Sequence, residues 1–475
     1  MLTNVDHVKT EDIGSSGIAA YPLSRLEEMI AMNPAKGFGV FAIASLVSVG
    51  LLATGGAPVA AAPDSGPVTF TKDVAPILQR SCQACHRPGS MAPMSLLTYE
   101  DARPWARAIK LKVAKREMPP WFIDRTVGVR KFKDDPSLTD REIDTIARWV
   151  DAGAPRGNPA DMPPARDFGD PNEWGIGTPD LVIMGVPTTV KAADSDRWTE
   201  WTVESGLTED RYLKAVETKP GLGPLSKQVT HHAIASLVQD GGDDTSLLGA
   251  ADDRRGASFL NEYAVGKNGD VYPEGSGRLI RAGAKIRVGM HYHSIGTEVI
   301  DQPRVGLVFY PKGVVPKYQL LADASEGGGG NADLDIPAGE DNVRHDGYVR
   351  LVKPTRLNSY QPHMHNRGKA QCLTAIHPNA RVETLNCVNN FQFGWMRVYV
   401  YADDVAPLLP AGTILQVTSW HDNTAANRYN PDPTNWAGYG QRTVDDMSHS
   451  WLTFVYLTDE DFKQQVEERR RSQTN

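Results

Sequence analysis

The sequence predicts a multidomain chain in which an α-helical N-terminal domain is followed by two all-β sandwich domains. Apolar residues between Ala102 and Val113 recur at i, i+3, i+4, i+7 and i+11, which is helical spacing. Beyond residue 178 the pattern changes to short strand-like runs separated by Gly, Pro, Asn and Asp, which is typical of β-sandwich or jelly-roll domains. Four consecutive glycines, Gly327 to Gly330, indicate a hinge between the two sandwiches.

The helical domain is expected to span residues 63–156. Val74, Ile77 and Leu78 give one helix face, and Thr139 forms a capping box with Glu142 that opens the last helix. The other expected boundaries are a Pro- and Gly-rich linker at 157–178, sandwiches at 179–326 and 331–462, and a polar tail at 463–475.

Residues 1–62 are predicted to be a leader and signal peptide. The stretch from Gly37 to Ala62 carries no charge, Lys36 precedes it, and Ala60-Ala61-Ala62 resembles a cleavage site. We therefore expect an exported, periplasmic protein. An uncleaved membrane anchor is the alternative, and the polar leader leaves the true start codon open.

Composition narrows the class of partner. The 475 residues carry 58 acidic and 50 basic side chains, a formal net charge of -8, without a basic stripe. Nucleic-acid binding depends on such a stripe, so nucleic acid is not expected as a partner. The sequence leaves the oligomeric state open.

A cysteine motif in the helical segment, Cys82-Gln83-Ala84-Cys85-His86, has the spacing of a c-type haem attachment site. The two thiols would form thioethers to the haem vinyl groups, and His86 would be one axial ligand. Met118 is the expected second axial ligand, because a thioether suits an electron carrier, and Met91 and Met94 compete for that role. A zinc site or a chance match is the alternative. With this motif, the domain resembles small c-type cytochromes.

The other two cysteines, Cys372 and Cys387, flank a turn signal at His377-Pro378-Asn379-Ala380 between two strand-like runs. A hairpin folded at Asn379-Ala380 would bring them opposite each other. We expect a disulfide, which an oxidising compartment would preserve. Two buried free thiols are the alternative.

Six residues form an ordered series of candidate copper ligands: His231, His232, His291, His363, His365 and Met447. Neutral imidazole suits copper, and a soft thioether favours Cu(I). His363 and His365 are i, i+2 on an expected strand, so both project to one face. With Met447 from a neighbouring strand, they would hold reduced copper where oxygen binds.

The earlier histidines predict a second, all-imidazole site. His231 and His232 are adjacent, so a regular strand would point them to opposite faces. They share a metal only if the strand is bulged or twisted, or if they use different ring nitrogens. His291 would complete this set, with His293 beside the ligands. An all-imidazole copper suits the entry of electrons.

These motifs resemble those of the copper type II, ascorbate-dependent monooxygenases, the family of peptidylglycine alpha-hydroxylating monooxygenase and dopamine beta-monooxygenase. The resemblance runs from about residue 179 to 459 and includes Asp445-Asp446-Met447 and Asn430-Pro431-Asp432-Pro433. It implies two jelly-roll domains with one copper each. The implied electron-transfer copper lies on His231, His232 and His291, and the oxygen-activating copper on His363, His365 and Met447. The substrate-binding residues of the animal enzymes find no motif here.

The predicted fold class is thus an α-helical cytochrome c domain followed by two all-β jelly-roll sandwich domains. The predicted function is that of an exported copper-dependent monooxygenase that hydroxylates a C–H bond of an unknown small organic substrate with O2. His363, His365 and Met447 are its expected catalytic residues. Its expected cofactors are two copper ions and one covalent haem c, which would supply or relay electrons, with an external donor also to be considered. The alternatives are a non-catalytic electron-transfer or copper-binding protein, and a binding module whose histidines hold zinc.

Overall fold

The computed structural model describes residues 66–475, except 91, 171, 195, 240–256, 265–266, 268, 327–332, 441 and 475. Gly66 to Asn475 form one unit of mutual contacts. The predicted signal peptide at 1–62 and the predicted glycine hinge at 327–330 lie outside the described residues. Among the helices that the structure describes, none is both long and apolar enough to cross a bilayer.

Short helical segments come first along the described chain. The longest of this group, α4 (Asp140–Asp151), begins at the predicted capping box, where the backbone amides of Thr139 and Glu142 each donate to the other's side chain. Trp149 and Phe70 are fully buried in the small apolar core of this group. The other segments are η1 (Phe70–Val74), α1 (Ala75–Ser81), α2 (Tyr99–Ala102), η2 (Arg103–Trp105), α3 (Ala106–Ala114) and η3 (Pro159–Asp161).

The predicted fold class is wrong, because the described chain is predominantly β-sheet and contains no separate helical cytochrome c domain. Up to residue 161 no described helix exceeds the 12 residues of α4. After α3 the chain leaves the helices: Trp121 and Phe132 are buried in the core of the C-terminal half, and Phe132 forms a β-bridge with Tyr401. Helical spacing in a sequence indicates local structure only. The segment after α3 is held instead by contacts with residues that are distant in the sequence.

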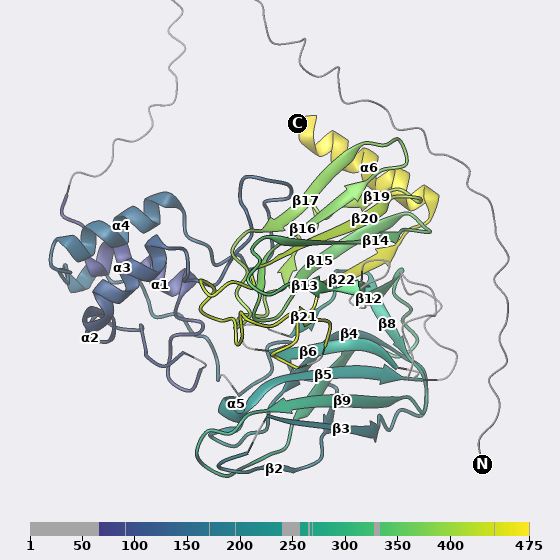
Figure 1. Cartoon of the computed structure of the whole chain (residues 1–475), viewed down its shortest axis with the longest axis horizontal. Helices are drawn as coiled ribbons and strands as arrows, with labels where there is room; N and C mark the ends of the chain where they lie inside the picture. Colours follow the sequence, from purple (N-terminus) through teal and green to yellow (C-terminus); the bar gives the residue numbers. More distant parts are fainter. Residues whose placement is uncertain are drawn as a thin grey trace, which may run out of the picture. The chain divides into compact units, whose positions relative to one another are not determined.

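Two four-stranded sheets and one ten-stranded sheet make up most of the described β structure (Figure 1). One four-stranded sheet, of order β3-β9-β5-β6, contains β3 (Arg197–Glu204), β5 (Thr230–Val238), β6 (Ala257–Ala264) and β9 (Lys285–Tyr292). The other, of order β14-β20-β16-β17, contains β14 (Val343–Arg350), β16 (Gly368–Ile376), β17 (Val382–Val388) and β20 (Ile414–His421).

The ten-stranded sheet runs through both halves of the β structure. It contains β1 (Leu181–Met184), β4 (Arg211–Lys219), β7 (Asp270–Val271), β8 (Ser276–Ile280), β11 (Arg304–Phe309), β12 (Tyr318–Glu326), β15 (Thr355–His363), β18 (Tyr399–Val400), β19 (Leu408–Leu409) and β22 (His449–Tyr456). β12 joins the halves, because it pairs in parallel with β8 and antiparallel with β22. The two sandwiches expected from the sequence therefore share one sheet.

Each four-stranded sheet packs its apolar face against the shared sheet. Val288 of β9 and Leu213 of β4 belong to one core, and Leu373 of β16 and Phe454 of β22 belong to the other. The remaining elements are β2 (Thr188–Val190), α5 (Ser226–Val229), β10 (Val299–Asp301), β13 (Asp335–Ile336), β21 (Ala437–Gly438) and α6 (Asp459–Thr474).

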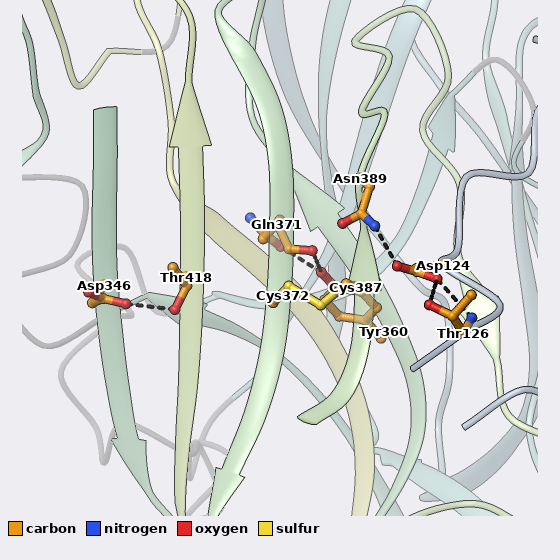
Figure 2. Close-up of a disulfide and its surroundings, with 9 residues drawn as sticks. All are labelled: Asp124, Thr126, Asp346, Tyr360, Gln371, Cys372, Cys387, Asn389 and Thr418. Carbon is orange, nitrogen blue, oxygen red and sulfur yellow. Dashed lines mark hydrogen bonds between the residues drawn. A yellow bond between two sulfur atoms is a disulfide. The ribbon is translucent and has the colours of Figure 1, made fainter. Parts of the chain in front are cut away.

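Cys372 and Cys387 form a disulfide, so the prediction made from the hairpin is confirmed (Figure 2). The two residues pair directly across β16 and β17, with their Cα atoms 4.1 Å apart. Ala380, in the turn between the strands, takes a left-handed φ of 64°. The bond ties β17, which lies at the end of its sheet, to its only neighbour in the described strand order.

Candidate metal centres

Three histidines from two neighbouring strands converge in the N-terminal half. His231 and His232 lie on β5 and His291 lies on β9, and one ring nitrogen from each lies within 4.8 Å of the others. Nδ1 of His231 is 3.1 Å from Nδ1 of His232. Two nitrogens bonded to one ion at ~2 Å stand roughly 3 Å apart. The pair is therefore spaced as two ligands of one metal are.

A β-bulge brings the two adjacent histidines to the same side. The register between β5 and β9 shifts so that Thr230 pairs with Tyr292 whereas His232 pairs with His291. His231 is the extra residue at this shift, and an extra residue bends and twists its strand locally. The condition that the sequence set for a shared metal, a bulged or twisted strand, is met.

The environment keeps these imidazoles neutral, which is the form that binds metals. Burial, reinforced by neighbouring histidines, lowers the pKa of His231 to about 4 and that of His232 to about 3. Burial also lowers the pKa of His291, against the opposing charge of Asp196. Both ring nitrogens of His291 are buried with no hydrogen-bond partner among the described residues, and Nε2 lies at an ion-pair distance of 3.2 Å from Asp196 Oδ2. A metal bound at Nδ1 would satisfy that nitrogen.

Trp198 covers one side of the first histidine group. It pairs with His291 across β3 and β9, and the two rings stack with centroids 3.9 Å apart and planes 10° apart. Trp198 is 47% exposed, so the indole separates His291 from solvent on that side. The ring of His293 lies 6.3 Å from that of His231, beside the convergent group and outside it.

A second histidine group lies in the C-terminal half. The rings of His363, at the end of β15, and His365 have centroids 5.5 Å apart, close to the 4.9 to 5.3 Å within the first group. Burial lowers the pKa of His363 well below its usual value, and its Nδ1 is buried with no hydrogen-bond partner among the described residues. Nδ1 of His365 lies 3.2 Å from the Asp445 carbonyl oxygen, which leaves Nε2 for a metal.

Asp446 is a fully buried carboxylate that organises this second group. Its Oδ1 accepts the backbone N–H of His365 and of Met447, each at 2.9 Å, and its Oδ2 accepts that of Arg367 at 3.0 Å. His421 Nε2 lies 3.3 Å from Oδ1. Burial would raise the pKa of Asp446, but the charge and hydrogen bonding of His421 and the amide donors together lower it.

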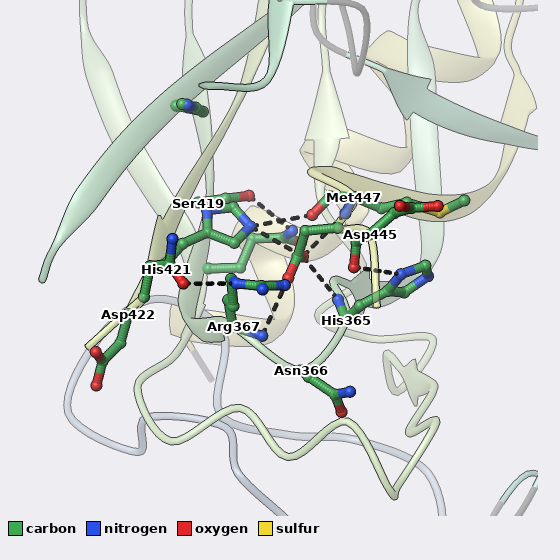
Figure 3. A network of polar contacts seen from close by, with 12 residues as sticks. His365, Asn366, Arg367, Ser419, His421, Asp422, Asp445 and Met447 are labelled. Atoms are coloured by element: carbon green, nitrogen blue, oxygen red, sulfur yellow. Dashed lines mark hydrogen bonds and ion pairs between the residues drawn. The ribbon is translucent and has the colours of Figure 1, made fainter. Parts of the chain in front are cut away.

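The shared carboxylate brings Met447 beside His365. Met447 is buried, and in Figure 3 its side chain and the His365 ring extend to the same side of the network. His363, His365 and Met447 are thus in one neighbourhood. Two further histidines lie here: His421 bonds the Met447 carbonyl oxygen at 3.1 Å, and His449 stacks on His363 at 4.7 Å.

The two histidine groups face each other across one aromatic ring. The Phe393 ring centroid lies 6.0 Å from that of His231 and 5.3 Å from that of His365. Sequence reasoning missed Phe393, because it lies in a loop and belongs to none of the metal-ligand motifs.

The cysteine motif lies where the first helical segments end, and both of its cysteines and its histidine are described. Cys82 and Cys85 are both free thiols, next to the end of α1. Nδ1 of His86 lies 3.3 Å from the Met94 carbonyl oxygen, which leaves Nε2 available to an iron atom. Met118 follows α3 and begins the segment that carries Trp121 into the β core. Met91 lies outside the described residues.

Arg397 connects the cysteine motif to the C-terminal half. Its guanidinium lies 5.4 Å from the Trp121 ring centroid. Burial raises the pKa of the Cys85 thiol, and the positive charge of Arg397 opposes that rise. The sequence did not indicate Arg397, since it too stands outside the recognised motifs.

Comparisons with known proteins leave the family open. No family model matches the chain, and no curated protein matches its sequence. Solved structures with some likeness include allantoicase from Saccharomyces cerevisiae, at 7% identity and a TM-score of 0.17, covering 55% of this chain and 77% of that one. A second allantoicase structure has 11% identity and a TM-score of 0.14, covering 55% and 83%. Xanthan lyase from Paenibacillus has 11% identity and a TM-score of 0.15, covering 64% and 28%. Likeness at this level carries no argument about fold or function.

Proposed function

We propose that the chain is an exported copper-dependent monooxygenase that hydroxylates a C–H bond of a small organic substrate, with electrons supplied or relayed by a covalently attached haem c. The observation that carries this proposal is the placement of two histidine groups on either side of Phe393, one with two Nδ1 atoms 3.1 Å apart. Two adjacent redox metals suit a reaction that needs two electrons. The resemblance of the ligand series to the copper type II, ascorbate-dependent monooxygenases supports the same reaction.

The first group suits the entry of electrons. His231, His232 and His291 would hold one copper through neutral imidazole nitrogens, a ligand type that serves both copper oxidation states. The bulge in β5 brings the rings of His231 and His232 to the same side, and Trp198 stacks on the His291 ring from the solvent side. These residues form a rigid all-nitrogen set.

The second group suits oxygen activation. His363, His365 and Met447 would hold the other copper, and the thioether of Met447 favours its reduced state. Copper bound here would supply one-electron chemistry to O2. With two electrons from the proposed donor and two protons from solvent, one oxygen atom would enter the C–H bond and the other would leave as water. Asp446 keeps His365 and Met447 at a fixed separation, and burial of this group excludes bulk water from it.

The cysteine motif supports the haem. Cys82 and Cys85 would carry the thioethers, and the contact of His86 Nδ1 with the Met94 carbonyl oxygen leaves Nε2 as the nitrogen that would bind the iron. Met118 is proposed as the second axial ligand.

Labelled dioxygen tests the proposal. The copper- and haem-loaded protein is incubated with 18O2, a reductant and a panel of small organic substrates, and products are analysed by mass spectrometry. We expect one 18O atom in an alcohol product, and none with Met447→Leu, which keeps the volume of the side chain and removes the sulfur. If both coppers and the haem bind but no substrate acquires label, the non-catalytic electron-transfer function replaces the enzymatic one.

A further inference from the structure

Phe393 lies between the two histidine groups. The proposed reaction leaves this side chain without a role. It lies in the loop between β17 and β18, half-buried against the core of the C-terminal half. Its ring is tilted 36° to the His231 ring and 62° to the His365 ring. A single side chain therefore contacts a predicted ligand of each copper.

The loop that carries Phe393 is anchored on both sides of the ring. Phe391 N donates to Lys369 O at 2.9 Å, and Trp395 N donates to Gln392 O at 2.9 Å. Asn389, at the start of the loop, donates to the carboxylate of Asp124. These bonds restrict the backbone, so the position of the ring is built into the fold.

The same region extends toward the cysteine motif. Arg397, four positions after Phe393, has its guanidinium over the ring of Trp121. On the other side, Lys227 of α5 donates to Gly89 O at 3.4 Å, which ties the chain just before His231 to the loop after the cysteines. Lys227 of α5 therefore contacts the loop after the cysteine motif, just before the chain reaches His231.

We propose that Phe393 is a positioning residue that couples the two copper sites, by fixing their separation and by providing the bonded and packed path along which electrons pass between them. This inference rests on the proposed function. Each transfer oxidises one Cu(I) at the first site and reduces one Cu(II) at the second, and no bond or proton changes. A packed ring gives a shorter and more constant path than mobile water would, because protein interiors are close-packed.

Rapid-freeze-quench electron paramagnetic resonance on the copper-loaded full chain tests this role. The two Cu(II) signals differ because one ligand set is all nitrogen and the other contains sulfur. After one electron equivalent is added per chain, the wild-type protein is expected to reach its final distribution between the sites within the earliest samples. Phe393→Leu, which keeps an apolar side chain and removes the ring, is expected to bind both coppers and to equilibrate severalfold more slowly.

Two further variants separate the ring from general effects of substitution. Phe393→Tyr keeps the ring and is expected to equilibrate at the wild-type rate. Tyr348→Leu removes a 45% exposed aromatic ring from β14 and is also expected to leave the rate unchanged. If Phe393→Leu holds two coppers and equilibrates as fast as wild type, the role of Phe393 is overturned while the proposed function stands. If the wild-type chain binds fewer than two coppers, both are overturned.

Discussion

The backbone amides of His365 and Met447 donate to the same atom, Oδ1 of Asp446, each at 2.9 Å. Two segments far apart in the chain are thereby fixed at one carboxylate. The proposed ligands His365 and Met447 thus owe their proximity to a residue that need not touch the metal at all.

Removing this carboxylate should damage both stability and metal binding. Asp446→Ala leaves three backbone N–H groups without their acceptor, those of His365, Arg367 and Met447. Each buried unpaired donor costs about 1–3 kcal/mol, so the free energy of unfolding should fall by at least about 3 kcal/mol. Denaturant unfolding measures this loss, and metal analysis should find one copper missing.

The neighbouring carboxylate provides a matched control for that experiment. The side chain of Asp445 pairs with Arg442, whose own side chain is 74% exposed, and such surface pairs contribute little. Asp445→Ala should therefore unfold close to wild type and keep two coppers. Equal unfolding midpoints for the two alanine variants would show that Asp446 does not organise the site.

The first histidine group should lose its metal independently of the second. His232→Ala removes one of the two Nδ1 atoms that lie 3.1 Å apart, and we expect copper to fall from two ions per chain to one. His293→Ala, which alters a histidine outside the convergent group, should retain both. Elemental analysis after dialysis measures the difference. Retention of two coppers by His232→Ala would exclude this residue as a ligand.

The sequence predicted correctly those features that depend on residues close together in the chain. The disulfide and the Thr139–Glu142 capping box were predicted because each follows from spacing within one hairpin or one helix turn. The sequence analysis required a bulged or twisted strand if His231 and His232 were to share a metal, because adjacent side chains on a regular strand point to opposite faces. The structure contains that bulge.

Long-range packing explains why the predicted fold class was wrong. The helical N-terminal domain was wrong because residues such as Trp121 and Phe132 pack with distant strands, and one sheet unites the two expected sandwiches through β12. Phe393 and Arg397 carry no metal-ligand spacing, and only folding brings them to the sites. Asp446 was recognised as part of a motif, but its three amide contacts could not be read from spacing.

The disulfide should stabilise the C-terminal half. Cys372 and Cys387 are separated by 15 residues, and a loop of this size contributes about 3 kcal/mol in the chain-entropy account. The double variant Cys372→Ser, Cys387→Ser should lose roughly this free energy of unfolding. The free energy of unfolding of the wild-type protein, measured by denaturant titration in the presence of a reductant, should match that of the double variant. An unchanged unfolding midpoint in both would show that β17 is held by its other contacts.

Glu262 should make the protein less stable as the pH rises. Burial raises its pKa above the ordinary 4.5, while Gln361 Nε2 donates to its Oε2 at 2.7 Å. The unfolded chain therefore releases this proton at a lower pH than the folded protein, and stability falls as the pH increases above about 4.5. Glu262→Gln, which keeps an acceptor oxygen, should be more stable than wild type near neutral pH, with the difference vanishing below the unfolded pKa.

Thermal unfolding across a pH series measures the Glu262 effect. Glu204→Gln serves as the control, because Glu204 is 64% exposed in its pair with Lys285 and should shift the curve little. If the difference in unfolding temperature between Glu262→Gln and wild type is the same at every pH, the buried carboxyl does not titrate differently in the folded and unfolded states.

X-ray absorption at the copper edge of the fully reduced, two-copper protein tests most directly whether Met447 marks the oxygen-activating site. With His363, His365 and Met447 as ligands, the wild-type spectrum should contain a sulfur scatterer on one of the two coppers, and Met447→Leu should lose that scatterer while both coppers remain bound. A wild-type spectrum without sulfur, or a sulfur contribution that persists in Met447→Leu, would contradict the assignment.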